Sequence, residues 1–221
     1  MMPITTVILA GGAATRMGGD KGLRLLHGRA LLDWVLDKVR PHSAEILLSL
    51  NTDNQNYVRE GCRIIKDIEN NVGPLAGLQA ALHHARHEWV ASVPCDTPFL
   101  PDDLLPQLLA ALQHSDAEVA VAAQGGQRHP TIALYRKNVS KKLDIFLSKG
   151  QRKVGDWLNT LKVREVPFDD TQDSFTQEYA TQEYSTQKIS TQAFLNINST
   201  QDLQHANQAP SPLIAQNERL K

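Results

Sequence analysis

The feature that most constrains the fold of this chain is a regular alternation of short apolar runs with longer helical patterns. Runs rich in β-branched residues, such as ITTVILA at 4–10 and WVASV at 89–93, alternate with amphipathic stretches such as RALLDWVLDKV at 29–39. Strands that alternate with helices predict an α/β fold in which helices cover both faces of a mostly parallel sheet. Because ITTVILA and WVASV lack polar alternation, we expect them at the buried centre of that sheet.

The same reasoning places the remaining elements. Further strands are expected at 45–51, 63–67, 118–124, 131–137 and 163–168, and helices at 77–88, 101–113 and, in one or two pieces, 139–161. Near the end of the chain, AFLNIN at 193–198 predicts a short strand, followed by a helix with Ser199 or Thr200 as its N-cap.

The composition suits one globular domain and excludes several classes of partner. The chain has 221 residues, of which 41% are hydrophobic, and its formal net charge is −1. No global positive field exists to attract nucleic acid or an anionic membrane, and no leader or long apolar segment is evident, so we expect a cytoplasmic protein. Cys62 and Cys95, the two cysteines, lack metal-ligand spacing and are interpreted as ordinary thiols.

A Thr-Gln repeat interrupts the last third of the chain. Thr-Gln recurs every five residues from Thr171 to Thr191, a period that matches neither a strand nor a helix. We interpret 171–192 as a polar insertion in a single domain spanning 1–208, with a partner-binding or regulatory segment as the alternative. Residues 209–221 are expected to form a flexible tail.

The first strand runs into a loop with five glycines, VILAGGAATRMGGDKG at 7–22. This loop is neither a P-loop nor a GxGxxG fingerprint. Gly11 and Gly12 would allow backbone N–H groups to approach a ligand at the carboxyl edge of the sheet, and Arg16 and Lys21 add two cations. The combination favours a bound polyphosphate; the alternative is an exposed turn in which Asp20 pairs with one of the cations.

Two further stretches contribute to the predicted site. In VPCDTPFLP, Asp96 follows a strand on a proline-rich connection, where one carboxylate suffices as a protein ligand for Mg²⁺. The alternative is that Asp96 or Thr97 caps the helix that follows. In NNVGPLAGLQAAL, we expect Gly73, Pro74 and Gly77 to form a turn before a helix, serving as a wall for a base or a phosphate or simply as an ordinary loop.

Taken together, LAGGAATRMGGDKG, GPLAGL, PCDTPFL, HPTIALY and FLNINSTQDL resemble the molybdenum cofactor guanylyltransferases, the MobA family of nucleotidyltransferases. The first motif is shared with sugar-nucleotide and cytidylyl transferases, whereas HPTIAL and the late Asn-x-Asn are similar to the molybdopterin branch. The resemblance covers about residues 5–167 and 193–205. It implies a three-layer Rossmann-like nucleotidyltransferase fold with a mostly parallel central sheet, and GMP transfer from Mg-GTP to the terminal phosphate of molybdopterin, with release of pyrophosphate.

The resemblance also implies roles for single residues. The guanine and ribose side of the pocket would be lined by Leu9, Ala10 and Gly11, the triphosphate would meet Lys21 and the motif arginine Arg16, and Asp96 would bind magnesium. Further nucleotide contacts would come from Asn51 and Asp67. We therefore predict Lys21, Arg16 and Asp96 as the catalytic set, because phosphoryl chemistry depends on charge stabilisation and alignment.

On the acceptor side, Asn196 and Asn198 match the family's Asn-x-Asn, and Arg152 with Lys153 matches a basic pair. Each pair has a structural alternative, an ordered turn for the asparagines and a solvated helix face for the basic residues. His129 of the HP motif is open to a structural or a ligand-binding role. The partners implied are GTP, molybdopterin or the molybdenum cofactor, and the molybdoenzymes or cofactor-delivery proteins that receive it.

Two other functions remain compatible with the sequence. The chain could be a different nucleotidyltransferase, either a cytidylyltransferase acting on the same cofactor or a sugar-phosphate enzyme. It could also be a non-catalytic nucleotide-binding sensor or cofactor chaperone that retains the fold.

Overall fold

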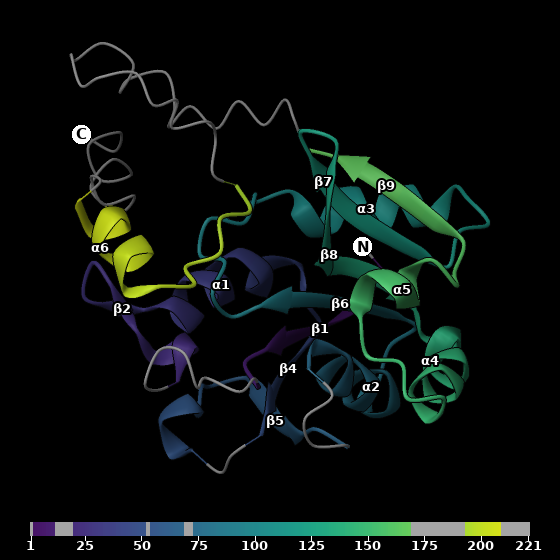
Figure 1. Ribbon diagram of the computed structural model, residues 1–221, viewed down its shortest axis with the longest axis horizontal. Coiled ribbons are helices and arrows are strands. Elements are labelled where there is room, and N and C mark those ends of the chain that lie inside the picture. The colour runs from purple at the N-terminus through teal and green to yellow at the C-terminus, as the bar shows by residue number, and fades with distance from the viewer. Residues whose placement is uncertain (1, 12–19, 52–53, 69–72, 169–192, 209–221) are drawn as a thin grey trace.

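The computed structural model describes residues 2–11, 20–51, 54–68, 73–168 and 193–208, which form a three-layer α/β fold (Figure 1). The central sheet has seven strands in the order β5-β4-β1-β6-β8-β7-β9. Only β8 among them runs antiparallel to its neighbours, β6 and β7, so the predicted mostly parallel sheet is confirmed. The strands are β1 Ile4–Leu9, β4 Glu45–Leu50, β5 Cys62–Lys66, β6 Trp89–Pro94, β7 Val119–Gln124, β8 Gln127–Arg136 and β9 Val163–Pro167.

The helices divide between the two faces of the sheet. Ile4 and Ile8 of β1 pack towards α1 and α3, whereas Val7 and Leu9 pack towards α2, α4 and α5, as expected for alternating side chains of a strand buried on both faces. The helices are α1 Leu31–Val39, α2 Pro74–His84, α3 Leu104–Gln113, α4 Ser140–Ser148, α5 Val154–Leu158 and α6 Thr200–Gln208. None of the helices in the described part of the chain has the length and apolar character needed to cross a membrane.

Helix α2 begins earlier than the sequence predicted. Gly73 is its N-cap at φ 71°, a left-handed conformation that suits glycine, and Pro74 occupies the first turn. Gly77 therefore lies inside the helix, and the predicted turn containing Gly73, Pro74 and Gly77 was wrong for Gly77. Proline at the first helical position fits because its fixed φ suits a helix and its missing N–H has no intrahelical partner there.

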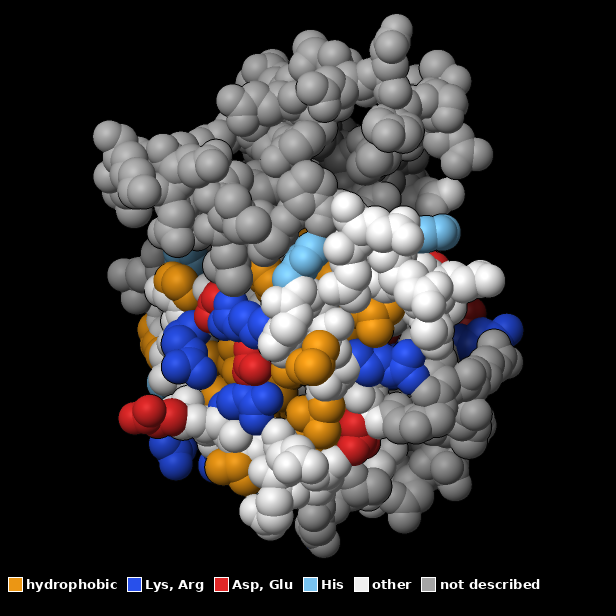
Figure 2. All heavy atoms as spheres, turned by 90° about the vertical axis from the view of Figure 1, so that its left-hand side faces the viewer, with side chains coloured by type: hydrophobic (Ala, Val, Ile, Leu, Met, Phe, Trp, Pro, Cys, Tyr) orange, Lys and Arg blue, Asp and Glu red, His pale blue; other side chains and the backbone are white. Residues whose placement is uncertain are grey.

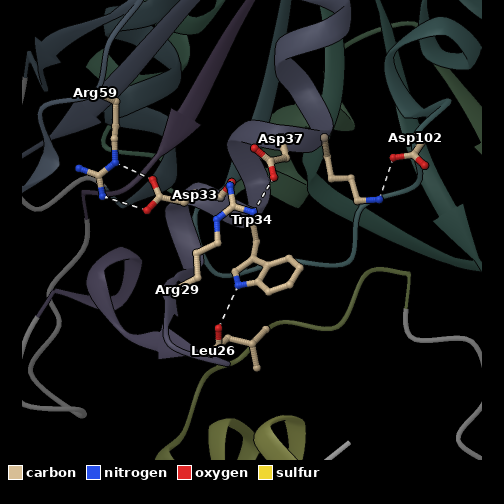
Figure 3. A network of polar contacts seen from close by, with 8 residues as sticks. Leu26, Arg29, Asp33, Trp34, Asp37, Arg59 and Asp102 are labelled. Atoms are coloured by element: carbon tan, nitrogen blue, oxygen red, sulfur yellow. Dashed lines mark hydrogen bonds and ion pairs between the residues drawn. The ribbon is translucent and has the colours of Figure 1, made fainter. Parts of the chain in front are cut away.

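Polar contacts around α1 hold a small hairpin, β2 Leu25–Leu26 with β3 Arg29–Ala30, beside the sheet (Figure 3). The Arg59 guanidinium reaches both carboxylate oxygens of Asp33, with Nε to Oδ1 at 2.5 Å. The indole N–H of Trp34 donates to the carbonyl of Leu26 at 3.1 Å. Leu26 and Trp34 belong to a small apolar cluster that also contains the fully buried side chain of Ile197. The hairpin and α1 thus form a seat for the C-terminal segment.

The segment 193–198 is not a strand, so that prediction was wrong. It does not pair with any strand of the sheet, and its backbone and side chains make single contacts. Phe194 packs on Phe168, and the Ile197 N–H donates to the carbonyl of Asp96 at 2.9 Å. The helix that follows was predicted correctly. Ser199 Oγ accepts from the N–H of Asp202, whose carboxylate accepts from the N–H of Ser199, a reciprocal cap. The Thr-Gln repeat and residues 209–221 lie outside the described residues.

Candidate functional site

Four strand ends bring polar residues to one edge of the sheet. Leu9 pairs with Ser49 and Pro94 in register, so β1, β4 and β6 end at the same level. Gly11, Asn51, Asp67 and Asp96 follow the ends of β1, β4, β5 and β6 by one or two residues. In open α/β sheets this carboxyl edge is where ligands bind. The strand register therefore brings these predicted residues to one edge of the sheet.

Gly11 is packed directly against two predicted nucleotide contacts. A Cβ atom at this position would lie 2.5 Å from Asn51 Oδ1 and 3.2 Å from Asp67 Oδ2, both closer than normal contacts allow. The N–H of Ala10 donates to the carbonyl of Ser49 at 3.1 Å, which fixes the start of the loop. A side chain at position 11 would therefore displace the Asn51 and Asp67 side chains from their present positions.

Asp67 is half-buried and bound by a hydroxyl group that sequence reasoning missed. Ser49 Oγ donates to Asp67 Oδ1 at 2.5 Å. Burial raises the pKa of Asp67 above its ordinary value, and the hydrogen bond from Ser49 opposes that rise. Ser49 therefore favours the ionised carboxylate and fixes its direction.

The same serine explains the glycine inside α2. A Cβ atom on Gly77 would lie 2.3 Å from Ser49 Oγ and 2.9 Å from Leu9 Cδ2. Helix α2 approaches β1 and β4 so closely that only hydrogen fits at this position. Gly77 thus acts on the site through packing, since its missing side chain makes room for the serine that holds Asp67.

Asp96 is the buried carboxylate of the site. It is 7% exposed, and its Oδ2 lies 3.3 Å from Nζ of Lys21, which comes from the short 3-10 helix Lys21–Leu23. Its other oxygen, Oδ1, is buried and accepts no hydrogen bond from any described residue. A buried acceptor without a partner is costly unless a ligand completes it. This oxygen suits a divalent cation, for which one or two carboxylates are sufficient protein ligands.

The described residues contain no group of three or more His, Cys, Asp or Glu side chains that could hold a metal by themselves. Magnesium does not need such a group, because it keeps waters and takes oxygens from a substrate phosphate. The neighbouring Cys95 is a free thiol whose pKa is raised to about 12, chiefly by burial and then by the Asp96 charge. The thiol therefore stays protonated at neutral pH.

The C-terminal segment 193–198 reaches the same site. Asn198 Oδ1 accepts from Nζ of Lys21 at 3.0 Å, and Asn196 Oδ1 accepts a short hydrogen bond from Thr97 Oγ1. The Ile197 N–H also donates to the carbonyl of Asp96. The three consecutive residues Asn196, Ile197 and Asn198 therefore contact Thr97, Asp96 and Lys21, respectively. The predicted Asn-x-Asn pair is thus next to Lys21 and Asp96.

Other predicted residues lie elsewhere. Arg152 and Lys153 are in the connection between α4 and α5, at the end of the molecule opposite to α6 (Figure 1), and Arg152 donates to the carbonyls of Leu147 and Gln151. The structure therefore does not bring this basic pair together with Asn198. Gly12 and Arg16 lie outside the described residues.

His129 has a structural contact. Its ring stacks on Phe194 with 4.6 Å between ring centroids, and burial lowers its pKa, which favours the neutral imidazole. Phe194 also packs edge-on against Phe168 at 5.4 Å. The HP motif thus helps to anchor the segment that carries Asn196 and Asn198. The sequence analysis did not predict the contacts of Ser49, Thr97 and Phe194 at this site. The available signals were that Ser49 is a polar residue near the end of a buried strand, that Thr97 follows Asp96, and that Phe194 belongs to the FLNIN motif.

Charges on the outer face near α6 are mixed. Figure 2 shows blue Lys and Arg side chains beside red carboxylates and orange apolar groups on this face. Arg29 pairs with Asp37 at 2.6 Å, and Lys38 pairs with Asp102 at 2.7 Å. The described residues of this face therefore mix both signs of charge.

A carboxyl edge that joins a glycine-containing loop, a lysine and a buried carboxylate defines an α/β nucleotide-binding protein. The MobA-like NTP transferase domain matches residues 6–165. Among curated relatives, the molybdenum cofactor guanylyltransferase of Shewanella sp. (strain MR-4) is 37% identical over 79% of this chain and 89% of its own length, and that of Shewanella piezotolerans is 34% identical over 93% of both. The chain therefore belongs to the MobA-like NTP transferase family and is a nucleotidyltransferase.

Solved structures agree on the fold. Molybdopterin-guanine dinucleotide biosynthesis protein A from Archaeoglobus fulgidus has a TM-score of 0.71 at 24% identity and covers 92% of this chain and 97% of its own. The 2-C-methyl-D-erythritol 4-phosphate cytidylyltransferase from Thermus thermophilus has a TM-score of 0.66 at 18% identity and covers 94% and 98%. The three-layer nucleotidyltransferase fold predicted from the sequence is confirmed.

Proposed function

We propose that this protein transfers GMP from Mg-GTP to the terminal phosphate of molybdopterin, or of the molybdenum cofactor, forming the guanine dinucleotide and releasing pyrophosphate. Curated relatives at 34–40% identity carry the name molybdenum cofactor guanylyltransferase. The observation that carries the chemistry is the buried Oδ1 of Asp96, which has no hydrogen-bond partner among the described residues, on the carboxylate whose Oδ2 pairs with Lys21. This cluster offers both a site for a cation and a positive charge for a phosphate.

The nucleophile in this proposal is the phosphate of the acceptor. The second pKa of a phosphate monoester is about 6, so at neutral pH it is largely dianionic and requires no general base. One of its oxygens forms a bond to the α-phosphorus of GTP, the bond from that phosphorus to the bridging oxygen breaks, and pyrophosphate leaves with the electron pair. The obstacle is repulsion between two anions, which the protein must offset by alignment and positive charge.

Each residue of the site has a proposed part in that task. Lys21, held at the carboxyl edge between Asp96 and Asn198, would bind phosphate oxygens and stabilise the charge that develops on pyrophosphate. Asp96 would hold magnesium, which neutralises charge on the triphosphate when bound. Leu9, Ala10 and Gly11, followed by Gly12, would line the base and ribose side. Arg16 is proposed as a second phosphate cation.

Asn51 and Asp67 are proposed as further nucleotide contacts. Both side chains converge on Gly11, and the Ser49 hydrogen bond favours the ionised form of Asp67, which can accept from ribose hydroxyl groups. On the acceptor side we propose Asn196 and Asn198. Arg152 and Lys153 stay a prediction for acceptor binding, to be tested by the KM for molybdopterin in charge-removing variants.

The decisive experiment measures pyrophosphate release with GTP, CTP, ATP and UTP, each with molybdopterin and Mg²⁺ and each without the acceptor. We expect release with GTP only when the acceptor is present. Use of CTP in place of GTP would contradict the proposed base selectivity. Binding of GTP with no release at saturating acceptor and magnesium would instead favour a sensor or chaperone.

A further inference from the structure

The strongest feature without a role so far is the contact between the C-terminal segment and the nucleotide side of the site. We infer that Asn198 is a positioning residue for Lys21, so that the segment 193–198 completes the triphosphate site before any acceptor binds. This inference rests on the proposed function, in which Lys21 meets the phosphates. The proposed function gives Asn198 a role in acceptor binding, and the inference adds a role in binding the nucleotide.

The geometry of Lys21 is the first argument. An ammonium group has three donors, and two of them reach Asp96 Oδ2 at 3.3 Å and Asn198 Oδ1 at 3.0 Å. Among the described residues no acceptor is recorded for the third donor, which can meet a phosphate oxygen. If Asp96 binds a cation, its carboxylate is shared with that cation, and the amide oxygen of Asn198 becomes the main protein group that directs Nζ.

The chemistry of the amide is the second argument. An amide oxygen accepts a hydrogen bond without adding charge, whereas a second carboxylate beside Asp96 would leave the cluster with a net negative charge. Lys21 therefore keeps its charge for the triphosphate while its long, flexible side chain is held in one direction. A lysine that is fixed in advance loses less conformational entropy when the ligand binds.

The anchoring of Asn198 is the third argument. On one side, Ile197 has a fully buried side chain and its N–H donates to the carbonyl of Asp96. On the other side, the backbone N–H groups of Asn198 and Ser199 both donate to Asp202 Oδ2, at 3.0 and 2.8 Å, in the cap of α6. Asn198 is exposed, yet its backbone is held at both ends, so its side chain can orient Lys21.

The test is equilibrium binding of Mg-GTP, and separately of guanosine, to the full-length protein without acceptor, for the wild type, Asn198→Ala and Asn198→Asp. A matched control is Gln204→Ala, an exposed position in α6. We expect Asn198→Ala to weaken Mg-GTP binding by about three- to tenfold, the contribution of one partly exposed hydrogen bond to a charged group, and to leave guanosine binding unchanged. Asn198→Asp should weaken Mg-GTP binding further at low salt, with a deficit that shrinks as salt is added.

A second measurement separates positioning from a structural effect. In a Lys21→Ala background, Asn198→Ala should have no further effect on Mg-GTP binding, because the group it directs is gone. Equal losses for Mg-GTP and guanosine, or additive losses in the double variant, would overturn the inference. So would unchanged Mg-GTP binding accompanied by a raised KM for molybdopterin. If wild-type protein does not bind GTP at all, the proposed function fails instead, and the two failures are thereby distinguished.

Discussion

Replacing Gly77 by alanine tests the packing that underlies the nucleotide side of the site. The added Cβ would lie 2.3 Å from Ser49 Oγ and 2.9 Å from Leu9 Cδ2. Non-bonded carbon atoms pack at about 3.5–4.0 Å, so α2 would have to withdraw from β1 and β4 by about 1 Å. Ser49 is 1% exposed and Leu9 9% exposed, so neither can turn aside into solvent.

The expected magnitude combines three effects. Overpacking of a core contact costs about 1–3 kcal/mol. Weakening the hydrogen bond from Ser49 to Asp67 costs about 1 kcal/mol, whereas alanine gains about 1 kcal/mol over glycine in helix propensity. The free energy of unfolding should therefore fall by about 1–3 kcal/mol, and the Tm by about 2–4 °C for each kcal/mol in a domain of this size.

The assay is urea unfolding, with Gly155→Ala as the matched control. Gly155 is also a helical glycine, in α5, but a Cβ atom there would meet nothing within 4 Å. The control should stabilise the protein by about 0.5–1 kcal/mol through helix propensity alone. If Gly77→Ala raises the unfolding midpoint as Gly155→Ala does, with unchanged denaturant dependence, the packing argument is refuted.

Three further predictions concern single polar groups. Asp96→Asn should keep the fold and reduce magnesium-dependent GMP transfer by at least about a hundredfold, since a bound metal contributes several kcal/mol, and near-normal turnover would remove Asp96 from the metal role. Lys21→Ala should lower transfer by about a hundredfold, measured as pyrophosphate release, while guanosine binding is retained; equal losses would indicate a structural lysine. Ser49→Ala removes the hydrogen bond that opposes the rise in the pKa of Asp67, so the acid limb of nucleotide binding should move to higher pH. The pKa of this carboxyl group is higher in the folded than in the unfolded protein, so its contribution to the free energy of unfolding falls as pH rises between the two pKa values. In Ser49→Ala this fall should continue to a higher pH. A stability profile identical to that of the wild type would contradict the role of Ser49.

Much of the fold could be predicted because its signals are local. ITTVILA and WVASV became the central strands β1 and β6, since a largely apolar run without polar alternation is favoured between two layers of helices. Asp96 was predicted just beyond the end of a strand. Parallel pairing brings the carboxyl ends of neighbouring strands to one edge of the sheet through backbone hydrogen bonds, independently of side-chain contacts. The segment 193–198 was mispredicted as a strand because its apolar residues alternate, yet they serve an aromatic cluster and a buried seat beside α1 instead of a ladder.

The sequence by itself determined the class of fold, the edge at which the site lies and the kinds of group gathered there. Only the tertiary structure decided which of these groups touch: Lys21 meets Asp96, 75 residues away, and Asn198, 177 residues away. It also decided that Gly77 lies inside a helix, under a serine that directs Asp67. The physical reason is that hydrophobic periodicity acts within an element, whereas contacts between side chains depend on how closely separate layers pack.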